Sequence, residues 1–371
     1  MKSNLSINRL PFLFTALALG AFCLLPLTGF AQETVSDSFS ASAGLPKNKI
    51  VATIPLGPPP DYLVVSPDSK FVYVANFTDS NTGIVQVIDT GTNTITATIT
   101  LGTGNEYFPN TLAITPDGGT LYVSQFDGTT IWVIDTASQR ITTTLNVSSP
   151  EGMAVTPDGT KLYVCNSGDA GTVTVIDTTT NQISNLIQVG TNNSPWDVVF
   201  TPDGSKAYIT VYRQSAIIHL LYLSVVDTAT ETAVTKIRVQ GGRSGFFTET
   251  MPNEVMGPNG KRLFLSFYSS VAVINTSSDR NTETIAQNFH HSATAITPDG
   301  KFLYMMVAKE SISREIKMVA VGSGDVVGKQ IGPLSFPRAV AIAPNGKFAY
   351  IFANKADGGS MALYVVDISR S

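Results

Sequence analysis

Cysteine and charge are both scarce in this chain. Two cysteines, Cys23 and Cys165, stand among 371 residues, and Asp, Glu, Lys and Arg together make up 14%. Cys23 lies in an apolar N-terminal run, so a chain that loses this run keeps one cysteine and cannot form an intrachain disulfide. The net charge of −4 gives no polybasic surface, which argues against duplex nucleic acid as a partner.

Long apolar runs are also absent after the N-terminus. The run Phe12–Leu25 follows the basic residues Lys2 and Arg9, and small residues stand three and one positions before a cut after Ala31. This layout is typical of a secretory signal peptide, with an uncleaved N-terminal anchor as the alternative. We therefore expect export to the periplasm, the cell surface or the medium, with no membrane span after cleavage.

The sequence predicts three parts. Residues 1–31 are the signal peptide, and the polar, aperiodic residues 32–48 are a disordered or loosely packed leader. Residues 49–371 carry one short phrase seven times: a Pro, then Asp or Asn and usually Gly, then a strand-like run with an aromatic residue. The seven prolines are spaced 40 to 56 residues apart and are Pro67, Pro116, Pro157, Pro202, Pro258, Pro298 and Pro344. A β-rich repeat of this period predicts an all-β, seven-bladed β-propeller with four antiparallel strands in each blade.

The third repeat shows how one blade is built. A short apolar run over 152–156 predicts the inner strand, and the Pro157 turn leads to alternating strands at 161–166 and 172–176. The more polar run 182–189 predicts the outer strand. Equivalent strands read Tyr-Val-Ala-Asn, Tyr-Val-Ser-Gln and Tyr-Val-Cys-Asn, and third strands end in Val-Ile-Asp or a close variant. With these motifs the chain resembles the YVTN family of β-propeller repeats over residues 50–368, the fifth and sixth repeats departing most.

Closure of the ring follows from the last repeat, which lacks an outer strand. It supplies runs at 339–343, 348–352 and 362–367 and then the chain stops. The run Lys49–Leu56 reads like the outer strand of the first repeat. We therefore expect the N-terminal strand to pair in the last blade, which removes two exposed strand edges.

A candidate site lies where the inner strands begin, at one mouth of the central channel. The residue six before each turn Pro, with a shift of one in the fifth repeat, gives a ring of unequal side chains: Asp61, Asn110, Glu151, Trp196, Asn253, Ser292 and Arg338. We expect the ring, apart from Ser292, to bind a small polar ligand. Asp61, Asn110 and Glu151 are candidate ligands for a hard divalent cation such as Ca²⁺, although no cofactor is predicted. Polar residues also occur at such mouths without any ligand.

Three other departures from the repeat are candidate functional elements. His290 and His291 precede the sixth inner strand, and His291 or Glu151 is a candidate base; hydrogen-bonded loop histidines are the simpler interpretation. The segment 212–223 either extends a hairpin or forms a contact patch. Residues 241–251, rich in glycine and aromatics, form a lid or a loop without function. A charged insertion at 309–317 reads as a solvated hairpin end.

The familiar catalytic motifs are missing. The sequence has no Gly-rich phosphate loop, Gly-x-Ser-x-Gly elbow, paired-Cys metal site or haem-attachment pattern. Cys165 reads as a buried, inert thiol. The Asp residues of the repeated turns and strand ends recur in nearly every blade, which indicates a structural role.

The resemblance implies an exported binding or scaffold module of the bacterial cell envelope, with an envelope protein or a glycan as partner. Related propellers include lactone hydrolases, which leaves a metal- or His-assisted lactonase using Asp61, Asn110, Glu151 and His291 as one alternative. A propeller subunit that partners a periplasmic dehydrogenase is another. Whether the chain is an enzyme stays open from the sequence.

Overall fold

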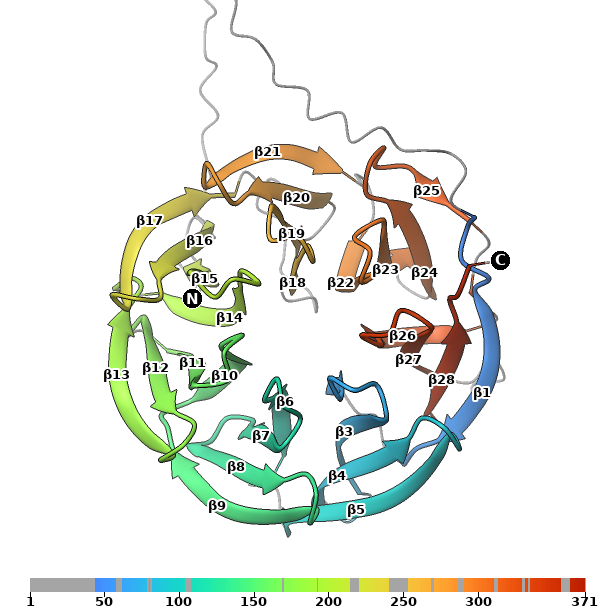
Figure 1. Ribbon diagram of the computed structural model, residues 1–371, viewed down its shortest axis with the longest axis horizontal. Coiled ribbons are helices and arrows are strands. Elements are labelled where there is room, and N and C mark those ends of the chain that lie inside the picture. The colour runs from blue at the N-terminus through green and yellow to red at the C-terminus, as the bar shows by residue number, and fades with distance from the viewer. Residues whose placement is uncertain are drawn as a thin grey trace, which may run out of the picture. The chain divides into compact units, whose positions relative to one another are not determined.

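The computed structural model describes residues 44–370 except 58–61, 79, 81, 104–107, 169, 192, 214–219, 240–252, 268–269, 286–289, 310–312, 329–330, 333 and 355–360. These residues form 28 strands in seven antiparallel sheets of four. The sheets follow one another around a ring, as Figure 1 shows. The predicted seven-bladed propeller is confirmed.

Each blade runs from an inner strand at the channel to an outer strand at the rim. Blade 1 comprises β2 (Tyr62–Val65), β3 (Phe71–Phe77), β4 (Thr82–Asp89) and β5 (Thr94–Thr103). Blade 2 comprises β6 (Pro109–Ile114), β7 (Thr120–Gln125), β8 (Thr130–Asp135) and β9 (Arg140–Asn146). Blade 3 comprises β10 (Pro150–Val155), β11 (Lys161–Asn166), β12 (Thr172–Asp177) and β13 (Gln182–Gln188). The strands predicted for this blade are found within two residues of their expected ends.

The remaining blades keep the same order. Blade 4 comprises β14 (Ser194–Phe200), β15 (Lys206–Arg213), β16 (Leu220–Asp227) and β17 (Thr232–Arg238). Blade 5 comprises β18 (Asn253–Met256), β19 (Arg262–Phe267), β20 (Ser270–Asn275) and β21 (Arg280–Ile285). Blade 6 comprises β22 (His290–Ile296), β23 (Phe302–Lys309), β24 (Ser313–Ala320) and the two-residue β25 (Val326–Val327). Blade 7 comprises β26 (Ser335–Ile342), β27 (Phe348–Asn354), β28 (Met361–Asp367) and β1 (Lys49–Pro55).

The first and the last strand of the described chain both belong to blade 7. β1 pairs antiparallel with β28, from Lys49 opposite Asp367 to Pro55 opposite Ala362, and the two strands lie side by side in Figure 1. This confirms the predicted closure. The attachment begins before the predicted boundary at residue 49, because the backbone N–H of Lys47 donates to the carbonyl of Ser369 at 3.2 Å.

The insertion at 212–223 extends a hairpin. Its described residues continue β15 and β16, which pair as far as Arg213 opposite Leu220. The charged insertion of blade 6 likewise lengthens β23 and β24, which pair as far as Lys309 opposite Ser313. Residues 241–251 lie outside the described part of the chain, and the predicted lid stays a prediction.

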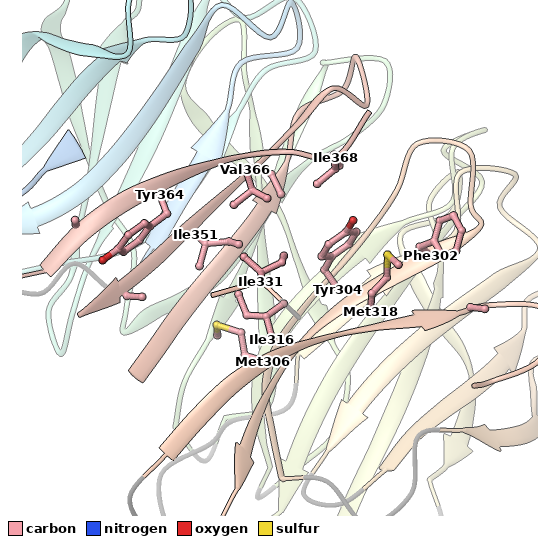
Figure 2. Packing of buried hydrophobic residues seen from close by; sticks show 14 residues of the cluster. Phe302, Tyr304, Met306, Ile316, Met318, Ile331, Ile351, Tyr364, Val366 and Ile368 are labelled. Atoms are coloured by element: carbon pink, nitrogen blue, oxygen red, sulfur yellow. The ribbon is translucent and has the colours of Figure 1, made fainter. Parts of the chain in front are cut away.

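The hydrophobic core is divided among the seven blade interfaces. Seven clusters of buried side chains each combine residues of two neighbouring blades. Figure 2 shows the cluster of blades 6 and 7, where Tyr304 and Met318 face Ile351 and Val366 between the two sheets. Burial of large side chains contributes roughly 1.5–3 kcal/mol each, so the blades stabilise one another rather than folding on separate cores.

An aromatic residue of each second strand occupies this interface. The seven equivalent residues are at most 2% exposed and are Tyr73, Tyr122, Tyr163, Tyr208, Phe264, Tyr304 and Tyr350. Several hydroxyls also reach the outer part of the next blade. Tyr208 donates to Asp279 Oδ1 at 2.6 Å, and Tyr304 donates to Asn48 Oδ1 at 2.7 Å. Asn48 thus makes, from the N-terminal segment, the contact that a turn residue makes in other blades.

The repeated Pro turns link neighbouring blades at the C-terminal ends of the inner strands. In blade 3 the Asp158 carboxylate accepts hydrogen bonds from the Thr156 hydroxyl at 2.6 Å and the Thr160 N–H at 3.0 Å. The turn glycine packs against the turn proline of the preceding blade: a methyl on Gly260, whose φ is 70°, would lie 2.8 Å from Pro202 Cδ. The repeated Asp residues are therefore structural, as the sequence predicted.

Replacing Tyr208 by Phe tests the inter-blade hydrogen bonds. We expect a loss of about 2 kcal/mol in the free energy of unfolding, because the variant removes a buried hydroxyl bonded to a carboxylate. Chemical denaturation of both proteins measures it. Tyr163→Phe is the matched control, since the buried Tyr163 hydroxyl has no hydrogen-bond partner among the described residues. Equal losses in the two variants would contradict this account.

Candidate functional site

The mouth of the channel is formed where the inner strands begin. In every blade the Pro turn follows the inner strand. The Pro turns therefore lie on one face of the ring, and the inner strands begin on the opposite face. Consecutive inner strands contact one another around the whole ring. Side chains near the start of β6, β10, β14 and β18 therefore face a common region.

Asn110 and Glu151 meet at this mouth. The Asn110 side-chain amide on β6 donates to Glu151 Oε2 on β10 at 2.7 Å. Asn110 is 5% exposed and Glu151 is half-buried. Burial raises the pKa of the Glu151 carboxyl, and hydrogen bonds from Asn110 and Ser167 oppose part of this rise. Two members of the predicted ring thus form one hydrogen-bonded unit across blades 2 and 3.

Trp196 and Asn253 continue the ring into blades 4 and 5. Trp196 is half-buried, and its backbone carbonyl lies against Gly152: a methyl on Gly152 would come within 2.4 Å of this oxygen and 2.6 Å of Asp197 Cα. Asn253 Oδ1 accepts from the Thr294 N–H of blade 6 at 2.9 Å. The Asn253 carbonyl oxygen therefore already joins two blades.

The other predicted ring residues are less defined. Arg338 is exposed on β26, and Asp61 lies outside the described residues. His290 and His291 belong to strand β22, opposite Ala308 and Val307, and not to a loop. The side chains of His290, His291 and Ser292 are not part of the description, so a role for His291 as a base stays a prediction.

Two further carboxyl groups lie on the inner strands of blades 4 and 5. Asp197 is on β14 and Glu254 on β18, and the Thr210 hydroxyl of β15 donates to Glu254 Oε2. Burial raises the pKa of Asp197 to about 7. Burial, and then the negative charge of Asp197, raise the pKa of Glu254 well above its usual range. Among the residues that the structure describes, the Glu254 Oε1 atom has no hydrogen-bond partner.

The sequence contained a signal for Glu254 that the ring alignment missed. Four residues before the turn Pro, other repeats carry an apolar residue or Thr: Leu63, Leu112, Met153, Val198, Thr294 and Val340. In the register these residues all oppose apolar residues of the second strand, as Glu254 opposes Leu265. The alignment considered only the polar position at the mouth, so a carboxylate in an apolar row escaped it.

Cys165 lies close to these acids. It is fully buried and free, and burial, followed by the charges of Asp197, Glu254 and Glu151, raises the pKa of its thiol well above the usual value. A thiol that stays protonated is a poor nucleophile, in agreement with the inert role predicted for Cys165.

The described residues contain neither a metal-binding cluster nor a membrane-spanning helix. No three His, Cys, Asp or Glu side chains among the described residues are grouped to hold a metal ion. In the same part of the chain, no helix has the length and apolar character needed to cross a membrane.

Comparison with known proteins identifies the architecture. No family model matches the chain, and no curated protein matches its sequence. Among solved structures, it is similar to a chain of Kuenenia stuttgartiensis hydrazine synthase, with a TM-score of 0.68 and 20% identity over 84% of this chain and 97% of that one. It is also similar to the β-propeller domain of Myceliophteria thermophila Cps50 (Swd1), with a TM-score of 0.69 and 11% identity over 86% and 99%. At these identities the similarity shows the fold alone.

Replacing Gly152 by Ala tests the close approach of blades 3 and 4 at the mouth. We expect a loss of about 1–3 kcal/mol in the free energy of unfolding, because the new methyl overlaps backbone atoms of Trp196 and Asp197. Thermal or chemical denaturation measures it.

Gly57→Ala is the control, since no atom lies within 4 Å of the position of its added methyl. The control should be neutral or slightly stabilising. A Gly152→Ala protein as stable as the control would show that the strands do not approach this closely.

Proposed function

We propose that this chain is an exported, YVTN-type propeller of the bacterial cell envelope that binds a partner protein or glycan at the mouth of its channel. The single observation that carries the proposal is the joined pair Asn110 and Glu151, a half-buried carboxyl group fixed across two blades. Fold alone specifies no ligand, so the proposal depends on this irregular mouth.

The mouth offers a mixed recognition surface. Glu151 supplies a carboxylate acceptor, the neighbouring blade supplies the half-buried Trp196, and Arg338 is exposed on β26. Aromatic and polar groups of this kind suit the planar faces and hydroxyl groups of sugars, or peptide side chains. Export is supported by the N-terminal run and its small residues before Ala31.

A lactonase is the second candidate, and the raised pKa of Glu151 favours it. A carboxyl group whose pKa moves toward neutrality is better matched to general acid–base work. In this alternative Glu151 accepts a proton from water, and Asn110 donates a hydrogen bond to the ester carbonyl. Asp61 and His291, which the sequence predicts at the same mouth, would assist it. A divalent cation such as Ca²⁺ would add Lewis-acid polarisation of that carbonyl when bound.

Partner binding should depend on the mouth. We expect the immobilised full chain to retain one stoichiometric partner from an envelope extract, and Glu151→Gln or Trp196→Ala to weaken retention about tenfold or more, as for a central interface residue. Glu283→Gln is the control, because it makes the same change on the exposed outer strand β21.

The outcomes separate the alternatives. Retention that Glu151→Gln and Trp196→Ala leave unchanged would contradict a mouth site, and a redox enzyme held in this way would favour the dehydrogenase-subunit alternative. Turnover of lactones by the purified chain, abolished by Glu151→Gln and kept by Glu283→Gln, would favour the hydrolase.

A further inference from the structure

An acidic residue of blade 5, Glu254, reaches into the interface with blade 4. Successive side chains of a strand point to opposite faces of the sheet. The residues equivalent to Glu254 in blades 2 and 4, Leu112 and Val198, pack in the hydrophobic cluster shared with the preceding blade. Glu254 is therefore expected to face blade 4. The contact with Thr210 of β15 confirms that Glu254 faces blade 4. Asp197 is directly opposite Thr210 in the pairing of β14 with β15, and opposed residues of two paired strands share a face. Asp197 and Glu254 therefore both lie beside Thr210, and the charge of Asp197 acts on Glu254.

Among the described residues, neither carboxyl group has a cationic partner. The ion pairs of the described residues do not involve Asp197 or Glu254. Asp197 Oδ1 accepts the N–H of Val198 at 2.9 Å. Glu254 is 5% exposed, and its Oε1 atom has no hydrogen-bond partner in the described part of the chain. Two uncompensated charges in this interface would be strongly destabilising, so a neutral form is favoured.

The surrounding titratable groups do not supply the missing charge. Glu151 of β10 and Cys165 of β11 are acidic groups and add only negative charge when ionised. The lysines of the packed strands β11 and β15 pair elsewhere, Lys161 with Glu231 and Lys206 with Asp279.

The other groups near these strands act elsewhere or stay neutral. Arg262 of β19 lies over the ring of Phe264. Burial keeps the pKa of Tyr163 and of Tyr208 far above neutrality. Asp177, the last residue of β12, accepts a hydrogen bond from the Thr180 N–H in an exposed turn. The side chains of Arg213 on β15 and of the β22 histidines lie outside the description.

We propose that Asp197 and Glu254 form a pH-sensitive contact between blades 4 and 5. While protonated, the pair is neutral and fits the packed interface. When protons leave to solvent, two like charges face each other inside it, and the blades separate at the mouth. The other blades carry Leu, Met, Val or Thr at the position of Glu254, which makes this interface the one that responds.

The sign of the effect follows from the direction of the shifts. Groups whose pKa is higher in the folded than in the unfolded state stabilise the fold at low pH, and this stabilisation is lost as pH rises through the folded value. For Asp197 that window lies between its usual pKa of 3.8 and about 7. The turn Asp residues, whose pKa is lowered, act in the opposite direction and at lower pH.

Thermal unfolding of the full chain across pH tests the proposal. We expect the wild-type Tm to fall by about 5 °C between about pH 5 and about pH 8, and the fall to be mostly absent in Glu254→Gln and Asp197→Asn. Glu283→Gln, on the exposed outer strand of the same blade, should follow the wild type.

Infrared spectroscopy gives a second readout that a purely structural role would not produce. At neutral pH the wild type should show the C=O stretching band of a buried protonated carboxyl group, absent in Glu254→Gln. If Glu254→Gln does not fold, the Tm of Asp197→Asn across pH and the infrared band of the wild type still test the proposal. Parallel Tm curves for wild type and the folded variant, or no protonated carboxyl band, would overturn the proposal.

Discussion

Packing between neighbouring blades is the interaction on which the rest of this structure depends. Every hydrophobic cluster joins two blades, and second-strand aromatics such as Tyr208 fill the interface and bond to the outer part of the next blade. The Pro turns also link neighbouring blades on one face of the ring. The last of these links joins blade 7 to blade 1, where the N–H of Asn345 donates to Ser69 Oγ. A chain of seven such interfaces is stable only when the last blade meets the first, which the pairing of β1 with β28 provides.

This dependence explains why the fold was predictable and the site was not. Turn and strand chemistry repeat seven times, so Pro157 and the motif around Tyr163 report the blade period and its strands directly. The site arises from residues that break the repeat, and their meaning depends on register and burial. Asn110 and Glu151 were found because they stand at the mouth, whereas Glu254 was missed because it replaces an apolar residue inside an interface.

The two ends of the inner strands therefore serve different purposes. At the turn end, groups such as Asp158 satisfy local N–H donors and recur in most blades. At the mouth, consecutive blades present side chains whose surroundings differ: Asn110, Glu151, Asp197 and Glu254. The pKa values of the three carboxyl groups among them are raised. Because the interfaces elsewhere carry the stability, the ring can tolerate buried and half-buried acids at one place, where we propose binding and a response to pH.

Native-state hydrogen exchange across the whole chain tests most directly whether the ring is one cooperative unit closed by its two ends. If it is, the buried amides of β3, β15 and β27 should exchange only through global unfolding, with similar free energies of opening in all three blades. Exchange of blade 7 at a much lower free energy than blades 1 and 4 would show that β1 does not close the ring, and would contradict this account.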